Sequence, residues 1–572
     1  MSRKPFFTFF YFLLLSCTFI LAAFLRFYKL GQVPSSLDWD EVSLAYNAKS
    51  LLQTGKDEFG HSWPLSIQSF NDYKPPVYTY LLIPVLKVFG NTDFAVRFPS
   101  ALAGTMTVLV TYFLVKELLN SGNREQETRN NVFERLTIND LRFTPLLSAL
   151  LLAISPWHLQ FSRIAFEANV GLFFFVTGIW LLIRAFHKNS QWSMFFSVVS
   201  MSMALMSYHS LRVVLPLTVI ATLVIYRKEL LILLRSDLAA ARSDLFRQLI
   251  PLILSAFLTI LTILTISYTV FFQKVGQSRF KATSFLTIDN LLTVNNDRLE
   301  KYGKNPVDKI VSLKYFVYAK QYIKGYLDHF DLRFWFLDGD RIDRHRAPDV
   351  GLLYWWELPF LFMGLMSLIG PMSPMATKEK AVLLLWFFLA PSASALTGGT
   401  PSAVRSLVFL PTFQIFTALG IVFTLKHLRK FLVIGLLGYW VIGLFEVGHY
   451  LHQYYVHSPL EYASAWQYGY KQMVKNVMEE KDNYEKILIT TSYDQPYIYL
   501  LWYGDYDPKT WTNDGEFNKL FDKFEFKKID RLEMSNLKNT LFVGAPAEIP
   551  SGNLKWRVDY PNGQAVFLAT EK

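Results

Sequence analysis

The sequence predicts an α-helical polytopic membrane protein that ends in a small soluble α/β domain. Of its 572 residues, 52% are hydrophobic and 18% are charged, whereas a soluble chain carries about a quarter charged residues. The apolar residues are gathered in blocks long enough to cross a bilayer as helices. These blocks stop near residue 450, and shorter apolar runs separated by polar turns follow. We therefore expect a transmembrane domain over residues 1–450 and a soluble domain over residues 451–572.

About 11 apolar blocks approach or reach the ~17–25 residues that a spanning helix needs. They cover residues 6–27, 94–118, 143–159, 170–186, 192–208, 211–226, 249–272, 352–369, 381–396, 404–425 and 431–450. Arg3 and Lys4 precede the first block, and no cleavage motif follows it. We therefore expect a retained anchor and a cytoplasmic N-terminus.

An apolar run at residues 77–89 is shorter than a spanning helix needs, which favours a helix in the membrane interface. When this run is left out of the spans, the basic loops, among them "NREQETRNNVFER" and "KHLRK", all fall on the cytoplasmic side. Residues 28–93, 160–169 and 273–351 and the C-terminal tail then lie outside. The basic loops explain the net charge of +11. A stripe of basic and aromatic residues, as expected for nucleic-acid binding, is not evident.

The tail has the pattern of a small α/β domain. "KILITT" and "NTLFVGA" are typical of buried strands, and "QPYIYLLWYG" between them is typical of a helix. "WRVDYPNGQAVFLAT" predicts a hairpin that turns at Asn562 and Gly563. We recognise no set of catalytic residues there, so the expected role is a cap or a docking site for an acceptor.

The stretch "LDWDEVSLAY" places two carboxylates, Asp40 and Glu41, just after the first apolar block. From Asp40 onward the pattern predicts an amphipathic helix along the membrane surface. Its apolar stripe is Leu44, Ala45, Ala48, Leu51 and Leu52, and its polar stripe is Asp40, Ser43, Asn47 and Ser50. The helix dipole would favour the ionised Asp40 at the N-terminus. Asp40 is then either a general base at the outer face or an ordinary N-cap.

Two further stretches bring charged residues to the same outer face. "NDYKPPVYTYLL" contributes Lys74, and "SPWHLQFSRIAFEANV" contributes Arg163 and Glu167. Asp40 and Glu167 together have the character of the carboxylate pairs used in glycosyl chemistry. The alternatives are that Lys74 snorkels to the interface and that Arg163 and Glu167 form a structural pair.

These motifs, "DWDE", "KPPVYTY" and "SPWHLQFSRIAFEAN", resemble those of glycosyltransferases that use polyprenyl-phosphate sugars and have the GT-C fold. This group, similar to glycosyltransferase family 39, includes the protein O-mannosyltransferases and the aminoarabinose transferases that modify lipid A. The resemblance covers most of residues 6–226 and is more diffuse beyond them. Two features depart from it. Ser43 stands where the aminoarabinose branch has arginine, and residues 273–351 look too short and too helical for the β-trefoil insert of the mannosyltransferases.

The resemblance implies three acidic site residues. Asp40 matches the catalytic acid of the first outer loop, with Glu41 beside it. Glu167 stands where the group has a second acidic residue.

The resemblance also implies a set of cations that hold the donor phosphate. Lys74 of "KPP" matches a lysine with this role in the aminoarabinose branch. Arg212 in "YHSLRVVLP" and Arg405 in "TPSAVRSLVFLP" are looser matches to basic positions, and Arg163 is a further candidate. Arg212 and Arg405 could instead contact lipid headgroups.

A sugar on a polyprenyl phosphate is already activated, so the predicted reaction needs no nucleotide. It needs a base for the acceptor hydroxyl and cations for the leaving phosphate. The expected partners are the lipid-linked sugar donor, a protein, glycan or lipid acceptor, and membrane lipids.

We expect no cofactor. His158 and His209 lack the spacing of metal ligands, and "LDGD" at residues 337–340 favours a turn. Some transferases of this fold that use lipid-linked oligosaccharides take a divalent cation, which is the disfavoured alternative here. A transporter or lipid flippase is the competing function. It would place paired charges near the middle of the membrane and tend toward repeated halves, whereas these acids lie in outer loops.

Overall fold

The computed structural model describes the chain except residues 1–3, 71, 129–141, 236–241, 273–283, 286–288, 303–304, 308–312, 371–372, 374, 428–429, 512–519, 531–533, 535–536 and 551. Much of the predicted basic loop "NREQETRNNVFER" therefore lies outside the described residues. The chain forms two compact units. Unit 1 is Met1–Arg26, Ala101–Ser162 and Glu167–His449, and unit 2 is Phe27–Ser100, Arg163–Phe166 and Tyr450–Lys572. A change of unit falls between His449 and Tyr450, and residues 27–100 belong to the same unit as the C-terminal segment.

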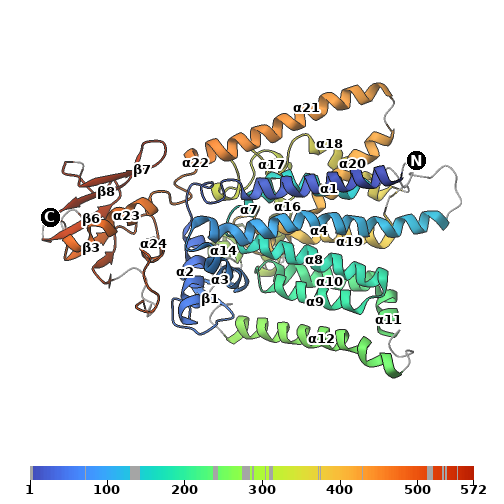
Figure 1. The fold of residues 1–572 in the computed structure, drawn as a ribbon, viewed down its shortest axis with the longest axis horizontal. Helices are drawn as coiled ribbons and strands as arrows, with labels where there is room; N and C mark the ends of the chain where they lie inside the picture. The colour runs from blue at the N-terminus through green and yellow to red at the C-terminus, as the bar shows by residue number, and fades with distance from the viewer. Residues whose placement is uncertain are drawn as a thin grey trace. The chain divides into compact units, whose positions relative to one another are not determined.

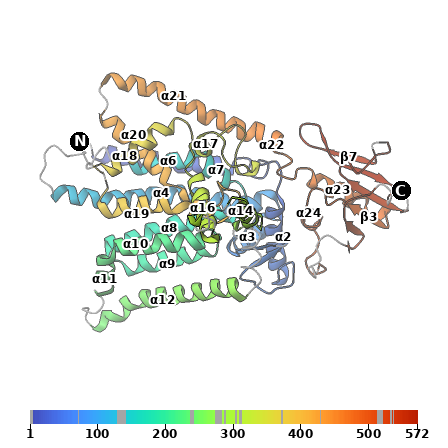
Figure 2. The same ribbon diagram turned by 180° about the vertical axis from the view of Figure 1, so that it is seen from behind.

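Long helices dominate unit 1 and run side by side (Figures 1 and 2). Its main helices are α1 (Lys4–Phe27), α4 (Asp93–Thr128, starting in unit 2), α6 (Thr144–Ile154), α7 (Pro156–Ser162), α8 (Glu167–Lys188), α9 (Gln191–Leu205), α10 (Leu211–Ile225), α11 (Arg227–Arg235), α12 (Arg242–Ser267), α14 (Asp289–Tyr302), α16 (Lys314–Asp328), α17 (Leu332–Phe336), α18 (Glu357–Ile369), α19 (Thr377–Leu389), α20 (Thr412–His427) and α21 (Lys430–His452). Every expected apolar block falls on one of these helices or on a pair of them.

Six stretches within the described residues are long and apolar enough to cross a membrane. They are Phe9–Phe27, Asp93–Asn120, Glu167–Lys188, Leu249–Val270, Thr377–Leu396 and Leu407–Lys426. Helices α6, α10 and α18 are apolar but shorter. The predicted fold class, a polytopic helical membrane protein with a C-terminal sheet domain, is confirmed. The count of about 11 spans, and the exclusion of residues 77–89 from them, stay predictions.

The block predicted at residues 143–159 is interrupted by a sharp break between α6 and α7. The break falls at Ser155, because the residue before a proline is disfavoured in the helical conformation. Arg26 caps the freed end of α6: its Nη1 donates to Ala153 O at 3.1 Å and its Nη2 to Leu152 O at 3.2 Å. A buried arginine thus satisfies carbonyls that have lost their helical donors.

Helices α18 and α20 approach each other more closely than side chains allow. A Cβ added at Gly364 would lie 1.8 Å from Phe416 O, and one added at Gly420 would lie 1.8 Å from Phe360 O. Small residues at such crossings are typical of helix pairs in membranes, where close backbone packing drives association.

The loop predicted at residues 273–351 is partly helical where the structure describes it. It contains α14, α16 and α17 and a 3₁₀ turn at Asp343–His345. Helix α16 packs on the segment that follows α19. The predicted helical character of this loop is confirmed for the described residues.

In unit 2, helix α2 (Trp39–Thr54) packs on α3 (Val77–Phe89) and on the hairpin β1 (Ile67–Ser69) and β2 (Asp72–Lys74). The sequence predicted an exposed polar stripe on α2, and this prediction is wrong. Every residue from Glu41 to Leu51 is buried. The polar side chains find partners inside the unit instead: Ser43 Oγ lies 2.7 Å from Ser69 Oγ, and Asn47 Nδ2 donates to Glu58 Oε1 at 3.3 Å.

The C-terminal part of unit 2 is a mixed six-stranded sheet in the order β4-β5-β3-β6-β8-β7. Its strands are β3 (Lys486–Ile489), β4 (Leu520–Phe521), β5 (Phe524–Phe526), β6 (Thr540–Gly544), β7 (Trp556–Asp559) and β8 (Ala565–Glu571). Strand β3 pairs in parallel with β5 and β6, whereas β6–β8 and the β7–β8 hairpin are antiparallel. The predicted strands, the helix α24 (Pro496–Tyr503) and the hairpin are confirmed.

Successive residues of a strand point to opposite faces of the sheet, and here both faces are covered. Leu568 joins Leu488 and Phe542 in an apolar cluster on one face. The adjacent Phe567 packs at 5.0 Å on Tyr470, the first residue of α23 (Tyr470–Glu480). Helix α23 and strands β4 and β5 were not predicted from the sequence, and the two strands are only two and three residues long.

Candidate active site

The start of α2 is fixed by a reciprocal cap. The Asp38 side chain accepts a hydrogen bond from Glu41 N at 2.8 Å, and the Glu41 carboxylate accepts one from Asp38 N at 3.1 Å. This capping box satisfies two donors at the helix end. The reading of Asp40 as the N-cap is therefore wrong, because Asp38 is the cap and Asp40 lies in the first turn.

Asp40 pairs with Lys74. Asp40 Oδ1 lies 2.5 Å from Lys74 Nζ, and the two side chains are 34% and 8% exposed. The hairpin positions the lysine: Lys74 ends β2 and stands opposite Ile67 of β1. Two of the predicted site residues, 34 positions apart in the sequence, are thus brought together. In this pair the carboxylate is partly exposed, whereas the lysine is nearly buried.

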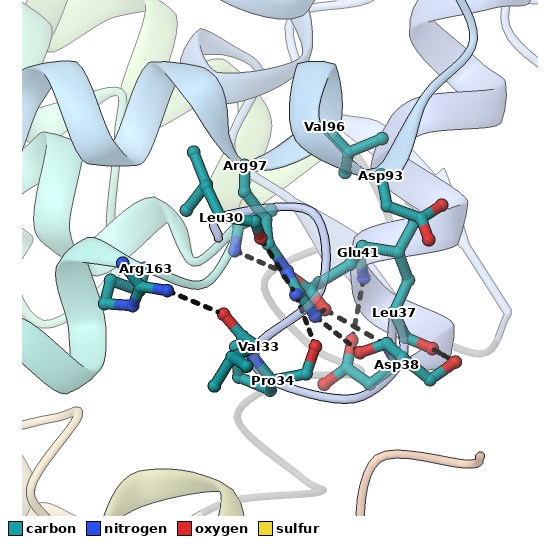
Figure 3. A network of polar contacts seen from close by, with 12 residues as sticks. Leu30, Val33, Pro34, Leu37, Asp38, Glu41, Asp93, Val96, Arg97 and Arg163 are labelled. Atoms are coloured by element: carbon teal, nitrogen blue, oxygen red, sulfur yellow. Dashed lines mark hydrogen bonds and ion pairs between the residues drawn. The ribbon is translucent and has the colours of Figure 1, made fainter. Parts of the chain in front are cut away.

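Glu41 points the other way, into a buried network (Figure 3). Its two oxygens accept hydrogen bonds from Arg97 Nε at 2.9 Å and Nη2 at 3.0 Å. Glu41 Oε1 also accepts one from Ala165 N at 2.8 Å. Glu41 and Arg97 are both fully buried, and this bidentate geometry is the strongest form of carboxylate pairing. The geometry gives Glu41 the position of an anchor for the neighbouring Asp40.

Arg97 also gathers the loop that leads into α2. Its Nη1 donates to Leu30 O at 3.3 Å and Pro34 O at 2.8 Å, and its Nη2 donates to Ser36 O at 2.5 Å. Arg97 was not among the site residues predicted from the sequence. The available signal was one arginine inside a predicted apolar span, which is rare and by default functional.

Arg163, predicted to bind phosphate, is almost completely buried in the same unit. Its Nη2 donates to Val33 O at 3.0 Å, and its Nε donates to Tyr454 OH at 3.1 Å. The guanidinium also lies 5.3 Å from the Tyr454 ring and 5.1 Å from the Tyr455 ring. These contacts favour a structural role, in which Arg163 holds the loop before α2 as Arg97 does.

The other three predicted site residues belong to unit 1. Glu167 is the first residue of α8, and Arg212 lies in the first turn of α10, where its Nε donates to Leu205 O at 3.4 Å. Arg405 Nη1 donates to Thr397 Oγ1 at 2.8 Å and to Gly398 O at 2.9 Å.

Packing brings the segments that carry these residues to one end of unit 1. Gly171, in the second turn of α8, packs against Leu211 and Tyr208 at the start of α10. Phe175, one turn further along α8, packs at 4.9 Å on Trp386, whose Nε1 donates to Val408 O at 2.6 Å.

Within the described ranges, the structure contains no group of three or more His, Cys, Asp or Glu residues that could hold a metal ion. Asp340 of "LDGD" accepts hydrogen bonds from Ile342 N at 2.9 Å and Ala403 N at 2.6 Å, and lies 3.0 Å from His345 Nδ1. Burial acts to raise the pKa of Asp340, but these bonds outweigh burial and lower it. The predicted turn fits this geometry. Metal independence stays a prediction.

The sequence and the fold of this chain are similar to those of several known proteins. The chain matches the family model for dolichyl-phosphate-mannose-protein mannosyltransferase over residues 73–123. An uncharacterised protein from Aquifex aeolicus (strain VF5) is 27% identical over 211 residues, which are 36% of this chain and 37% of that protein. The crystal structure of ArnT from Cupriavidus metallidurans bound to undecaprenyl phosphate matches with a TM-score of 0.51 at 11% identity, covering 100% of this chain and 98% of that one.

The chain has the GT-C fold. The archaeal oligosaccharyltransferase AglB from Archaeoglobus fulgidus matches with a TM-score of 0.47 at 11% identity, and the match covers 88% of this chain and 64% of that one. The family model covers the segment that carries Lys74 and Arg97. The segment that matches the family model thus supplies the cations that pair with Asp40 and Glu41 of α2.

Proposed function

We propose that this membrane protein is a glycosyltransferase that moves a sugar from a polyprenyl-phosphate donor to a hydroxyl of an acceptor at the outer membrane face. The observation that carries the proposal is the Asp40–Lys74 pair, in which a partly exposed carboxylate meets a nearly buried lysine at 2.5 Å. The names of the matched proteins, which include dolichyl-phosphate-mannose and undecaprenyl phosphate, support this donor class.

In the proposed reaction the acceptor oxygen attacks the anomeric carbon of the donor sugar. The bond between that carbon and the phosphate oxygen breaks, and polyprenyl phosphate leaves with the bonding electrons. Asp40 takes the proton of the acceptor hydroxyl as general base. Lys74 stabilises the negative charge that grows on the leaving phosphate. The lysine therefore exchanges its carboxylate partner for the phosphate when the donor binds.

The remaining predicted residues divide into two groups. Arg212, Arg405 and Glu167 belong to unit 1. Their predicted roles, as phosphate ligands for the two arginines, whose guanidinium groups offer two parallel donors to a phosphate, and as a second acid for Glu167, stay predictions. Glu41 and Arg163 are positioning residues, because their polar groups bind the chain itself. The acceptor is a protein, glycan or lipid. The N-terminus is cytoplasmic, and the site and the sheet domain are extracytoplasmic.

The decisive variant is Asp40→Asn. It keeps the size of the side chain and leaves the Asp38 cap in place, but it removes the ability to take a proton. We expect turnover to fall by ~10²–10⁴, with binding of undecaprenyl phosphate largely intact. The assay follows transfer from radiolabelled polyprenyl-phosphate mannose to cell-envelope acceptors by protein in nanodiscs. Asp72→Asn, a carboxylate on the same hairpin, is the matched control and should keep wild-type turnover.

Lys74→Ala separates binding from proton transfer. A charge-assisted contact is worth about 1.5–3 kcal/mol, so the affinity for undecaprenyl phosphate should fall roughly 10- to 150-fold. If Asp40→Asn keeps near-normal turnover while Glu167→Gln abolishes it, Glu167 is the base. If the protein in liposomes moves lipid from one leaflet to the other but transfers no sugar, the result would instead favour a flippase.

A further inference from the structure

Helix α16 carries an exposed face that is both apolar and basic. Phe316, Ile323 and Leu327 are spaced so that they form one stripe along a helix, and Leu313 extends the stripe at its start. These four side chains are between 51% and 59% exposed.

Lys320 and Lys324 lie beside this stripe, and Lys314 is at the N-terminal end of the helix. Lys314, Lys320 and Lys324 are all exposed. Lys324 Nζ pairs with Asp328 Oδ2 at 3.0 Å, and Asp328 is the only acidic residue in the helix. The exposed face therefore carries an excess of positive charge, and lysine stems are long enough to extend past apolar neighbours.

The opposite face of α16 is anchored to the end of a candidate membrane span. Tyr326 OH donates to Phe388 O, in the last turn of α19, at 2.7 Å. Gly325 lies against the segment just after that helix: a Cβ there would be 3.2 Å from Ala395 O. Phe330, two residues beyond α16, packs at 5.7 Å on Phe387. These contacts hold α16 at the depth where the apolar stretch Thr377–Leu396 ends.

An amphipathic helix at this depth, with large apolar side chains exposed between lysines, has the character of a helix that lies in a membrane interface. We propose that the exposed face of α16 binds the bilayer surface, with Leu313, Phe316, Ile323 and Leu327 among the upper acyl chains. Lys314, Lys320 and Lys324 then contact the phosphates of anionic phospholipids, whose charge is complementary to theirs.

A fluorescent probe tests the proposal in the full-length protein. Cys17 is the only cysteine, so Cys17→Ser gives a background for Ile323→Cys and Leu327→Cys, each labelled with NBD. In nanodiscs of phosphatidylcholine and phosphatidylglycerol, both labels should emit at shorter wavelength than a label at Asn562→Cys in the hairpin turn. Lipids with a spin label on the upper acyl chain should quench them. Replacing the three lysines by glutamine should abolish the extra shift seen with phosphatidylglycerol over phosphatidylcholine alone.

Two outcomes would overturn the proposal. Emission at both positions equal to that at Asn562→Cys, without quenching by spin-labelled lipid, would show that the face meets water. Disulfide crosslinking between two copies of Ile323→Cys, with a dimer in the nanodisc, would show that a second chain covers it. Thermal unfolding of each variant checks that the helix is intact, and two label positions guard against the failure of either one.

Discussion

At the scale of single residues, two adjacent carboxylates of α2 have opposite environments. Asp40 meets Lys74 near the surface, whereas Glu41 meets Arg97 in the interior. A partly exposed pair contributes little to stability, about 0–1 kcal/mol. Breaking a buried pair leaves an uncompensated charge in the interior. Neighbouring residues of one chemical type therefore have different environments: the Asp40 carboxylate is partly exposed, and the Glu41 carboxylate is buried in the structure.

This contrast predicts that Glu41→Gln destabilises the protein far more than Asp40→Asn. Glutamine keeps the size of the side chain but leaves the Arg97 guanidinium buried without a counter-charge, which costs about 3–5 kcal/mol. Asp40→Asn should change the stability by less than about 1 kcal/mol. Unfolding in detergent followed by tryptophan fluorescence measures both. Equal stabilities for the two variants would contradict the anchoring role of Glu41.

Glu58 gives unit 2 a pH-dependent stability. It is almost completely buried, and its Oε2 has no hydrogen-bond partner among the described residues. Burial raises the pKa of Glu58 to about 8 from an ordinary 4.5. The folded state therefore holds this proton more tightly than the unfolded chain does. The stability that the folded state gains by keeping Glu58 protonated is fully present below pH 4.5 and is lost as the pH rises through about 8.

Glu58→Gln should remove this dependence, because glutamine is neutral at every pH. Across the window from about pH 5 to 8 we expect the wild type to lose roughly 3–5 kcal/mol that the variant does not lose. Thermal unfolding measured at intervals of pH gives the two profiles. The exposed glutamate in Glu479→Gln is the control and should follow the wild type. Parallel profiles for the wild type and Glu58→Gln would show that Glu58 is ionised in the fold.

At the scale of elements, the sequence predicted helices and strands wherever periodicity was strong. The apolar blocks, the strands β3 and β6 and the hairpin turn at Gly563 all had clear local signals. Asp40 and Lys74 were selected as site residues because both stand in a recognisable motif, but the sequence did not predict that they pair with each other. The Glu41–Arg97 pair was not predicted either, because it joins residues 56 positions apart and only the tertiary fold shows which arginine a buried carboxylate meets. The buried polar face of α2 escaped prediction for the same reason.

The α18–α20 crossing predicts a sharp difference between glycines. In Gly364→Ala the new Cβ would lie 1.8 Å from the backbone oxygen of Phe416, so the two helices must separate. Overpacking of this kind costs about 1–3 kcal/mol or more. Gly438→Ala in α21 is the matched control, since a Cβ there meets nothing within 4 Å. Melting temperatures in detergent should fall for the first variant and hold or rise for the second. A Gly364→Ala protein as stable as Gly438→Ala would contradict the observed helix contact.

At the scale of the whole molecule, the sheet domain and residues 27–100 belong to one unit although they are far apart in sequence. Lys49 of α2, nearly buried, pairs with Asp505 at 2.6 Å and donates to Tyr506 O at 3.0 Å. Tyr499 OH of α24 donates to Leu37 O at 3.2 Å. The C-terminal residues thus support the helix that carries Asp40.

Asp505→Asn tests this support. The substitution leaves the buried Lys49 ammonium without its counter-charge, and an unsatisfied buried partner costs about 1–3 kcal/mol. Hydrogen exchange should therefore become roughly 10- to 100-fold faster at the amides of α2. The exposed acid in Asp559→Asn, on the β7–β8 hairpin, is the control. If exchange in α2 is unchanged, the sheet domain contributes nothing to the stability of that helix.

The three carbonyls that accept hydrogen bonds from Arg97 bear on how such proteins diverge. Leu30, Pro34 and Ser36 contribute main-chain oxygens, and every amino acid supplies one. Mutation can therefore replace the side chains of this loop over time while the anchor persists, whereas Glu41 and Arg97 cannot be exchanged one at a time without stranding a charge. A loop that is held mainly through its main-chain oxygens requires few specific side chains. It is suited to keep its architecture while the surrounding sequence changes.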